Sequence, residues 1–251
     1  MRKIALITGA TSGIGKATAK ILAKNNYDII ITGRRDERLG ELAVELIDKI
    51  GVECYPLCFD IRKKDEVECA INSLPEPWQN IDVLVNNAGL AAGLSPIQEG
   101  SLADWDQMID TNIKGLLYIT RIIAPIMAEK KSGHIINIGS IAGKETYANG
   151  NVYCATKHAV EAITKGLRID LNPSGIKVGS ICPGAVETEF SVVRLKDADA
   201  NKKVYAGFTP LQAQDIAETV LFMVTRPAHV NIGDILILPT AQAAATIFNK
   251  K

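Results

Sequence analysis

Tyr153 and Lys157 are two residues whose spacing allows them to act together on a proton. They stand four positions apart in a stretch with a helical pattern, so both side chains share one helix face. A free tyrosine, with a pKa of about 10, is a poor base near neutrality, and a fixed ammonium group beside it favours the phenolate. The pair predicts a group that takes a proton from an oxygen atom or returns one to it.

Ser140 comes about a dozen residues before Tyr153, directly after a short apolar run. Its hydroxyl can hold a substrate oxygen in place by hydrogen bonding. The three residues together predict oxidation of an alcohol, in which a proton leaves oxygen as hydride leaves carbon. A chain with six tyrosines matches the Tyr-x-x-x-Lys spacing by chance about half of the time, so the pair alone carries little weight.

A glycine-rich turn near the N-terminus gives the second chemical signal. It follows an apolar run and precedes an amphipathic stretch, which is where a backbone cradle for a pyrophosphate is found. Glycines also serve simple helix packing, and this alternative stays open for the spacing by itself. The predicted cofactor-binding residues of this turn are Gly9, Ala10, Thr11, Ser12, Gly13, Ile14 and Gly15.

Arg34 and Arg35 follow Gly33 at the end of the second apolar run. In dinucleotide-binding folds an acid at this point holds the ribose 2′-hydroxyl, whereas arginine suits a 2′-phosphate. The arginines therefore favour NADP over NAD. The alternative is that both simply end a strand in solvent.

Two further strand ends carry residues suited to a cofactor crevice. Asp60, followed by Ile61, closes the third apolar run, and its carboxylate can accept from an adenine amino group or cap the next helix. Asn87, Ala88 and Gly89 follow the fourth run, where small residues and an amide leave room for a passing cofactor.

The elements that must position these residues alternate along the whole chain. The apolar runs are nearly continuous, as in strands covered on both faces, and the stretches between them have helical periodicity. This order predicts an α/β fold, a doubly wound parallel sheet of about seven strands in one domain, residues 1–251. The predicted strands are Lys3–Thr8, Asp28–Thr32, Glu53–Phe59, Ile81–Asn86, His134–Gly139, Lys177–Cys182 and Ile235–Leu238, and the predicted helices are Gly13–Asn26, Asp36–Ile50, Lys64–Leu74, Asp104–Lys130, Asn151–Asn172 and Leu211–Thr225.

Composition narrows the classes of function. The 28 basic residues balance the 28 acidic ones, which gives no electrostatic basis for binding nucleic acid or an anionic membrane. The five cysteines and three histidines lack ligand spacing, so we expect no metal site and no disulfide framework. A reducing, cytoplasmic location fits this cysteine usage.

These motifs, in this order, resemble the short-chain dehydrogenase/reductase family, and the match covers almost the whole chain. The resemblance implies a Rossmann-like fold, NADP as cofactor, a small-molecule substrate and a homotetramer. It implies that Asn112, Ser140, Tyr153 and Lys157 are catalytic, with Asn112 holding a water that links the lysine to a proton relay. Without the resemblance, Asn112 reads as a polar packing residue of a helix. The nicotinamide contacts it implies are Pro183, Gly184, Val186 and Thr188.

Longer stretches are similar to the NADP-dependent 3-hydroxy acid dehydrogenases, among them 108–116, 150–159, 186–191, 226–232 and 239–243. Members of that group oxidise serine, allo-threonine and related short acids, or reduce the matching semialdehydes. Residues 194–198 depart from the group's Arg-Phe-Lys-Gly-Asp. A short acid needs a cation for its carboxylate, and Arg194, in a predicted mobile substrate segment at about 188–209, is the hypothesis, with a solvent-facing arginine as the alternative.

Two other functions remain open from the sequence. One is a carbonyl reductase of the same family that acts on bulkier ketones, and the other is a catalytically silent NADP-binding regulator. The apolar tail at about 240–251 is expected to dock on another subunit, since such a surface is unfavourable in water.

Overall fold

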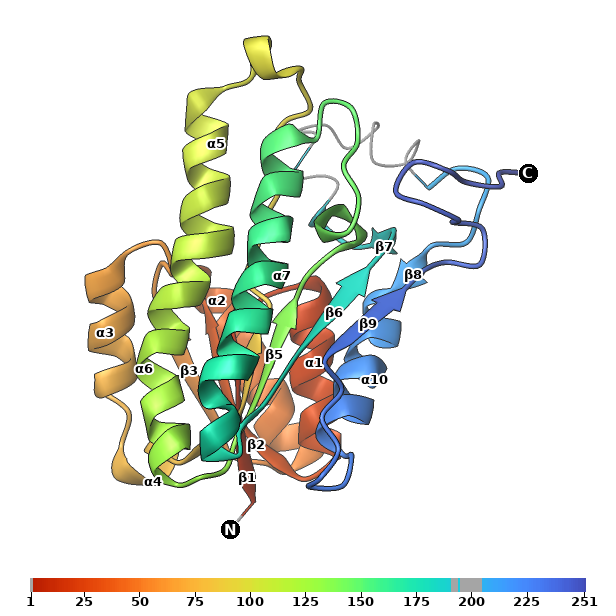
Figure 1. The fold of residues 1–251 in the computed structure, drawn as a ribbon. Helices are drawn as coiled ribbons and strands as arrows, with labels where there is room; N and C mark the ends of the chain where they lie inside the picture. The colour runs from red at the N-terminus through yellow and green to blue at the C-terminus, as the bar shows by residue number, and fades with distance from the viewer. Residues whose placement is uncertain (1, 191–193, 195–204) are drawn as a thin grey trace.

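A computed structural model of the chain describes residues 2–190, 194 and 205–251. Its centre is a sheet of seven parallel strands in the order β3-β2-β1-β4-β5-β6-β9 (Figure 1). The strands are β1 (Lys3–Ile7), β2 (Tyr27–Gly33), β3 (Cys54–Cys58), β4 (Ile81–Asn86), β5 (His134–Ile138), β6 (Lys177–Pro183) and β9 (Asp234–Ile237). The predicted doubly wound sheet is confirmed, and all seven predicted strands are present.

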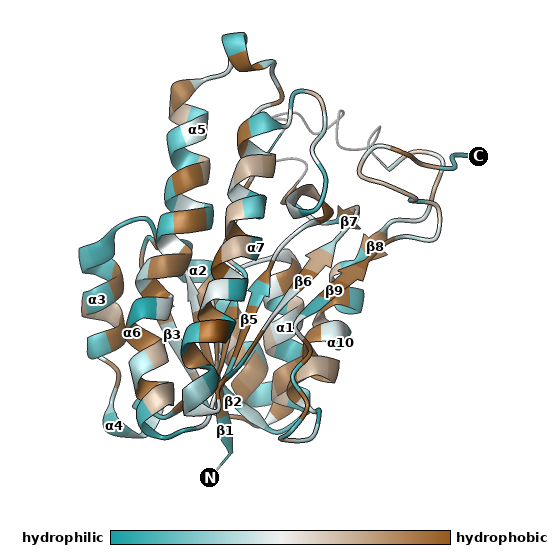
Figure 2. Cartoon of the chain, in the orientation of Figure 1, coloured by the Kyte–Doolittle hydropathy of each residue, from teal (hydrophilic) through white to brown (hydrophobic). Residues whose placement is uncertain are grey.

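Helices cover both faces of the sheet, which is why its central strands are buried and mostly apolar. Successive side chains of β1 point to opposite faces. Ile7 packs with α1 (Gly13–Lys24), α2 (Asp36–Glu45) and α10 (Ala213–Val224), whereas Leu6 packs with α3 (Lys64–Asn72), α6 (Leu116–Glu129) and the end of α7 (Asn151–Leu171). In Figure 2 the strands are mostly brown, and the helices carry brown and teal residues on different sides.

The longest predicted helix differs from the sequence expectation in its middle. Instead of one regular helix over 104–130, α5 (Leu102–Ile109) and α6 are joined by a π-helical turn, η3 (Asp110–Gly115). A π turn inserts an extra residue into an α-helix and is frequent at functional sites. Asn112 lies in this turn and is buried.

Smaller elements complete the chain. They are the short helix α4 (Glu76–Gln79), π turn η1 (Leu46–Ile50), the 3-10 turns η2 (Ile97–Glu99), η4 (Ile141–Gly143) and η5 (Asn172–Ser174), and a two-stranded sheet of β7 (Val186–Glu187) and β8 (Leu211–Gln212). The β7–β8 pair lies beyond the carboxyl end of β6 (Figure 1). Sequence periodicity does not reveal strands of two residues.

The strand order reverses between β1 and β4, and parallel α/β sheets bind ligands at that reversal, outside the carboxyl ends of the strands. Most of the predicted mobile segment at about 188–209 falls outside the described residues. Within the described ranges, no helix combines the length and the apolar character that crossing a membrane requires.

Candidate active site

A cavity of about 740 Å³ lies at the carboxyl ends of the strands. Nearly all the residues predicted from the sequence to bind cofactor or substrate line it. The exceptions are Ala10, Gly15 and Asn112, which are buried behind its wall. The predicted residues on the wall are Gly9, Thr11, Ser12, Gly13, Ile14, Arg34, Arg35, Asp60, Ile61, Asn87, Ala88, Gly89, Ser140, Tyr153, Lys157, Pro183, Gly184, Val186, Thr188 and Arg194.

The glycine-rich turn leads directly into α1 at Gly13. Gly9 has a φ of +66°, and a Cβ on Gly15 would lie 2.4 Å from the carbonyl oxygen of Gly9, so neither position accepts a side chain without a shift of the backbone. Ser12 precedes the helix with no side-chain cap, which leaves the first N–H groups of α1 for another acceptor. These features fit a pyrophosphate at the positive end of the helix.

Asn87 holds this turn in place from the end of β4. Its side-chain amide donates to the carbonyl oxygens of Thr8 and Gly9 at 2.8 and 3.1 Å. The hydroxyl of Thr8 accepts from the backbone N–H groups of Asn87 and Ala88. The amide at this strand end therefore braces the loop, a role that its position in the sequence alone did not specify.

The two predicted arginines occupy different environments. Arg35 donates to Thr11 Oγ1 at 2.6 Å, to Ser12 Oγ at 2.9 Å and to Glu189 at 3.0 Å, which fixes its guanidinium beside the turn. Arg34 is exposed on the cavity wall and makes no hydrogen bond or ion pair within the described part of the chain. The charge of Arg35 is paired with Glu189, so Arg34 is the arginine of the two that the cavity wall offers to a 2′-phosphate of NADP.

Asp60 does not cap the following helix, because the residue that precedes α3 is Lys63. Its carboxylate instead accepts from the side chain of Arg62 at 2.5–3.0 Å and from the backbone N–H of Arg62. Burial opposes ionisation, but these bonds outweigh it and hold the pKa of Asp60 below its usual range. The carboxylate is on the cavity wall as an acceptor, which leaves the adenine contact as a prediction.

Tyr153 and Lys157 lie near the start of α7, and both are buried. Burial raises the pKa of Tyr153 well above its usual value, against a lowering hydrogen bond with Ser140. Phe190 packs against its ring, with the centroids 5.8 Å apart. The tyrosine is therefore protonated around neutral pH in the ligand-free protein, ready to donate a proton.

Lys157 donates from Nζ to the carbonyl oxygen of Ile138 at 2.9 Å. Burial lowers its pKa to about 8, while Cys182 and Glu161 act in the opposite direction. Lys157 thus carries its positive charge at neutral pH and loses it in mildly alkaline solution. Lys157 can lower the pKa of Tyr153 only while it carries this charge.

Asn112 binds three protein groups through its amide. Its Oδ1 accepts from the backbone N–H of Leu90 at 2.8 Å, and its Nδ2 donates to the carbonyl of Leu90 and to Thr156 Oγ1. The hydroxyl of Thr156 donates in turn to the carbonyl of Tyr153. Asn112 therefore connects the loop after β4 to the catalytic turn of α7, and the water-holding role remains a prediction.

Arg194 lies beside the predicted catalytic tyrosine. Its guanidinium carbon is 5.2 Å from the ring centroid of Tyr153, and one nitrogen donates to the hydroxyl of Tyr147 at 3.0 Å. The other two nitrogens are buried and have no hydrogen-bond partner within the described residues. Two buried cationic donors without acceptors are unfavourable unless a ligand supplies them.

Several cavity residues were missed by sequence reasoning. Tyr147 is one, and Glu189, which pairs with both Arg35 and Arg38, is another. The C-terminal tail also packs on its own chain, because Gln242 is buried and accepts from the backbone N–H of Ala185. The tail residues on the cavity wall are Gln242, Ala245, Thr246 and Phe248.

Replacing Arg34 with Asp is expected to shift cofactor preference toward NAD. The change removes a cation from the cavity wall and places a carboxylate that repels a 2′-phosphate and accepts from a 2′-hydroxyl. The ratio of kcat/KM for NADP to that for NAD should fall by about 10- to 100-fold. Lys49→Asp, an exposed change in η1, is the control and should leave the ratio unchanged.

Comparison with known proteins identifies the family of the chain. The family model described as short chain dehydrogenase matches residues 3–199. The chain is 46% identical to the NADP-dependent 3-hydroxy acid dehydrogenase YdfG of Escherichia coli, over 96% of this chain and 97% of that protein. It is 45% identical to sulfoacetaldehyde reductase 2 of Chromohalobacter salexigens, over 97% of this chain and 96% of that protein.

A solved structure of serine dehydrogenase in its closed form, complexed with NADP+, has a TM-score of 0.92 and 44% identity, covering 99% of both chains. The protein is an oxidoreductase and its cofactor is NADP, as the sequence predicted. The resemblance to the 3-hydroxy acid dehydrogenases is also confirmed. The chain belongs to the short-chain dehydrogenase family.

Proposed function

We propose that this enzyme interconverts short 3-hydroxy acids, such as L-serine or L-allo-threonine, and the corresponding carbonyl acids, with NADP. The observation that carries the proposal is Arg194. Two of its nitrogens are buried next to Tyr153 and have no partner among the residues that the structure describes, so an anionic group bound to them would place a nearby hydroxyl close to the tyrosine. A guanidinium and a carboxylate form strong charge-assisted hydrogen bonds.

The reaction needs a hydride transfer and a proton transfer. NADP supplies the acceptor or donor of hydride at the carbinol carbon. In oxidation, the C–H bond breaks with its electron pair, the O–H bond gives its proton to the phenolate of Tyr153, and a C=O bond forms. In reduction, the neutral phenol of Tyr153 donates the proton to the new alkoxide oxygen, which fits the raised pKa of this residue.

The neighbouring residues prepare this transfer. Ser140 accepts from the backbone N–H of Ala142, an arrangement that fixes the oxygen while its own proton can be donated to a substrate oxygen. Lys157 places a positive charge one helical turn from the phenol, where it favours the phenolate in oxidation. Asn112 holds the catalytic turn of α7 against the loop after β4.

A second candidate substrate class is a short aldehyde with a sulfonate group. The relative named sulfoacetaldehyde reductase 2 favours it. A guanidinium binds sulfonate as well as carboxylate, because both present paired anionic oxygens. Comparing 3-hydroxypropionate with 2-hydroxyethanesulfonate, in NADP+ reduction by the wild type, ranks the two classes.

Arg194→Ala is expected to raise the KM for hydroxy acids by about 10- to 100-fold, the value of one or two charge-assisted hydrogen bonds. The KM for an uncharged alcohol or ketone should change little. Arg121→Ala is the matched control, since it removes an exposed arginine of α6. An equal effect of Arg194→Ala on charged and uncharged substrates would remove the assignment.

The rival functions make different predictions. A carbonyl reductase for bulkier ketones would turn over aromatic ketones faster than any short acid. A silent regulator would bind NADP tightly without turnover across a broad panel.

A homotetramer is part of the proposal, supported by exposed apolar side chains on α5, α6 and α7, namely Leu102, Leu117 and Ile169. Light scattering of the purified protein tests it, and a monomer would contradict it. We also propose that the tail at 240–251 contributes to assembly and that the protein is cytoplasmic, in keeping with its five free cysteines.

A further inference from the structure

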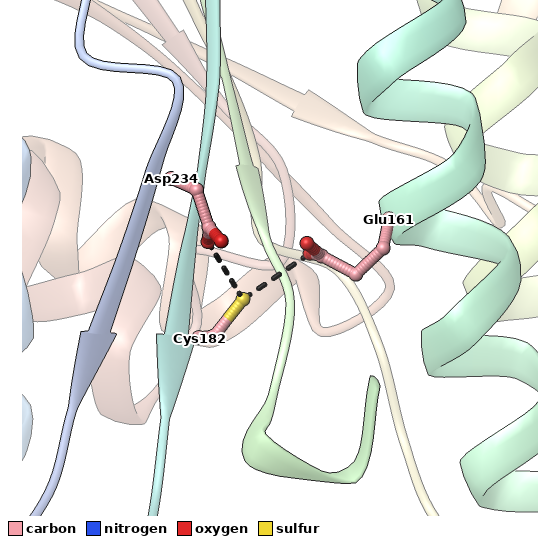
Figure 3. A group of neighbouring side chains, drawn as sticks. All are labelled: Glu161, Cys182 and Asp234. Carbon is pink, nitrogen blue, oxygen red and sulfur yellow. Dashed lines mark hydrogen bonds between the residues drawn. The ribbon is translucent and has the colours of Figure 1, made fainter. Parts of the chain in front are cut away.

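A cluster of polar side chains lies behind the predicted catalytic residues, and the proposed reaction does not yet use it. Glu161 comes from α7, Cys182 from β6 and Asp234 from β9, and Figure 3 shows the thiol between the two carboxylates. Glu161 and Cys182 are buried. A buried carboxylate requires a compensating charge or hydrogen bonds, so the partners of Glu161 decide what the cluster does.

Lys144 supplies the positive charge within the cluster. Its ammonium contacts Glu161 Oε2 at 2.5 Å and Asp234 Oδ2 at 2.6 Å. Although burial disfavours its charge, these bonds raise the pKa of Lys144 above its usual value. The ammonium thus occupies the place between the carboxylates that a metal ion would need, and we read the cluster as an ion-pair network.

Cys182 and Ser180 complete the network as neutral donors. The thiol donates to Glu161 Oε1 at 3.2 Å, and the Ser180 hydroxyl lies 3.3 Å from a carboxylate oxygen of Glu161. Burial and the nearby carboxylate raise the pKa of Cys182 to about 12, so the thiol is protonated at neutral pH. The thiol and the hydroxyl are therefore neutral donors to Glu161, whose side chain lies four residues along α7 from Lys157.

Glu161 and Lys157 both contact the end of β5. A Cβ on Gly139 would lie 2.8 Å from Glu161 Oε1 and 2.9 Å from Cys182 Sγ, while the preceding carbonyl, that of Ile138, accepts from Lys157. Gly143 packs between the backbone of Lys157 and the side chain of Glu161. The strand end that leads to Ser140 is thus held between Lys157 and the network.

The network beside Lys157 has a net negative charge. Two carboxylates and the Lys144 ammonium leave one net negative charge in the network, and Lys157 is the buried cation beside it. The residue of η3 that faces this part of α7 is Asn112, which is uncharged. Tyr147 and Arg194 interact with Tyr153. The titratable groups that act directly on Lys157 are Cys182 of β6 and Glu161 of α7. Lys144, after η4, pairs with Glu161 and with Asp234 of β9.

We propose that Glu161 is a positioning residue that keeps Lys157 in its ammonium form, and that Lys144 limits the strength of this effect by neutralising part of the network's negative charge. The proposal rests on the proposed roles of Tyr153 and Lys157. It predicts shifts of opposite sign for the two partners of one ion pair. A network that merely stabilised the fold would give no such pair of shifts.

The test is the pH profile of kcat/KM for carbonyl reduction with NADPH. Activity should fall as pH rises through the pKa of Lys157, about 8 in the wild type. Glu161→Gln removes a negative charge, destabilises the ammonium and moves this alkaline limb to lower pH, by on the order of one unit. Lys144→Met removes the positive charge that offsets Glu161 and Asp234, while Cys182 and Ser180 still donate to Glu161, and moves the limb to higher pH by a similar amount.

Glu41→Gln is the control, an exposed acid on α2, and should leave the limb in place. ¹³C NMR titration of the lysine Cε resonances, with Lys157 assigned by Lys157→Met, reports the same pKa without any substrate. The proposal is overturned if neither Glu161→Gln nor Lys144→Met moves the alkaline limb of the pH profile and the NMR pKa of Lys157. It is also overturned if both variants move them in the same direction. If the NMR pKa moves as expected but the limb does not, Lys157 is not the group that controls the reaction, and the proposed catalytic role fails instead.

Discussion

Tyr153→Phe is expected to lower kcat by about 10²- to 10⁴-fold, the usual contribution of a positioned proton donor or acceptor. Phenylalanine keeps the ring that packs against Phe190 and loses only the hydroxyl that exchanges the proton with substrate. The KM for NADP should change little, because the phosphate loop and Arg35 are untouched. Steady-state kinetics in both directions measures the effect.

The control for Tyr153→Phe is the thermal stability and NADP affinity of the variant, which should stay close to those of the wild type. Cys154→Ala, a buried neighbour in the same helix, should retain most of the activity. Residual activity of Tyr153→Phe above about a tenth of the wild-type value would mean that another group transfers the proton.

Gly15→Ala should have the second largest effect, a loss of about 100-fold in kcat/KM for NADP. The new Cβ would lie 2.4 Å from the Gly9 carbonyl oxygen and 2.5 Å from Asn87 Nδ2, so the turn must open. A displacement of about 1 Å at a binding group is enough for a loss of that size. Titration of NADPH fluorescence measures the affinity directly.

Gly40→Ala provides the matched control for the same substitution. Gly40 is exposed within α2, and a Cβ there meets no atom within 4 Å. Alanine should stabilise the helix by about 0.5–1 kcal/mol and leave NADP affinity unchanged. Equal NADP affinity in Gly15→Ala and the wild type would show that the turn does not hold the pyrophosphate.

The sequence predicted the sheet well because each strand carries its own signal. A strand buried on both faces is mostly apolar, and in β4 and β5 the polar residues are limited to Asp82, Asn86, His134 and Asn137. One cavity is lined by the glycine-rich turn, Ser140, Tyr153 and Lys157. They meet there because each follows the carboxyl end of a strand or begins the next helix. Local pattern and chain order are enough for these features.

The sequence did not predict contacts between residues that are far apart along the chain. Glu189 pairs with Arg35 and Arg38, more than 150 positions away, and Lys144 joins Asp234 across 90 positions. The helical pattern of 104–130 also hides the π turn at Asp110–Gly115, since an extra residue hardly changes the apolar spacing. Such features depend on which surfaces meet, and no local pattern encodes that.

In the function that we propose, a short anionic hydroxy acid is oxidised beside Arg194 and Tyr153. The most direct measurement is NADP+ reduction by the wild-type enzyme with 3-hydroxypropionate and with its uncharged counterpart, 1-propanol. We predict a kcat/KM about 10- to 100-fold higher for the acid, the value of its charge-assisted hydrogen bonds to the arginine. Equal values for the two compounds, or a preference for the alcohol, would contradict the account.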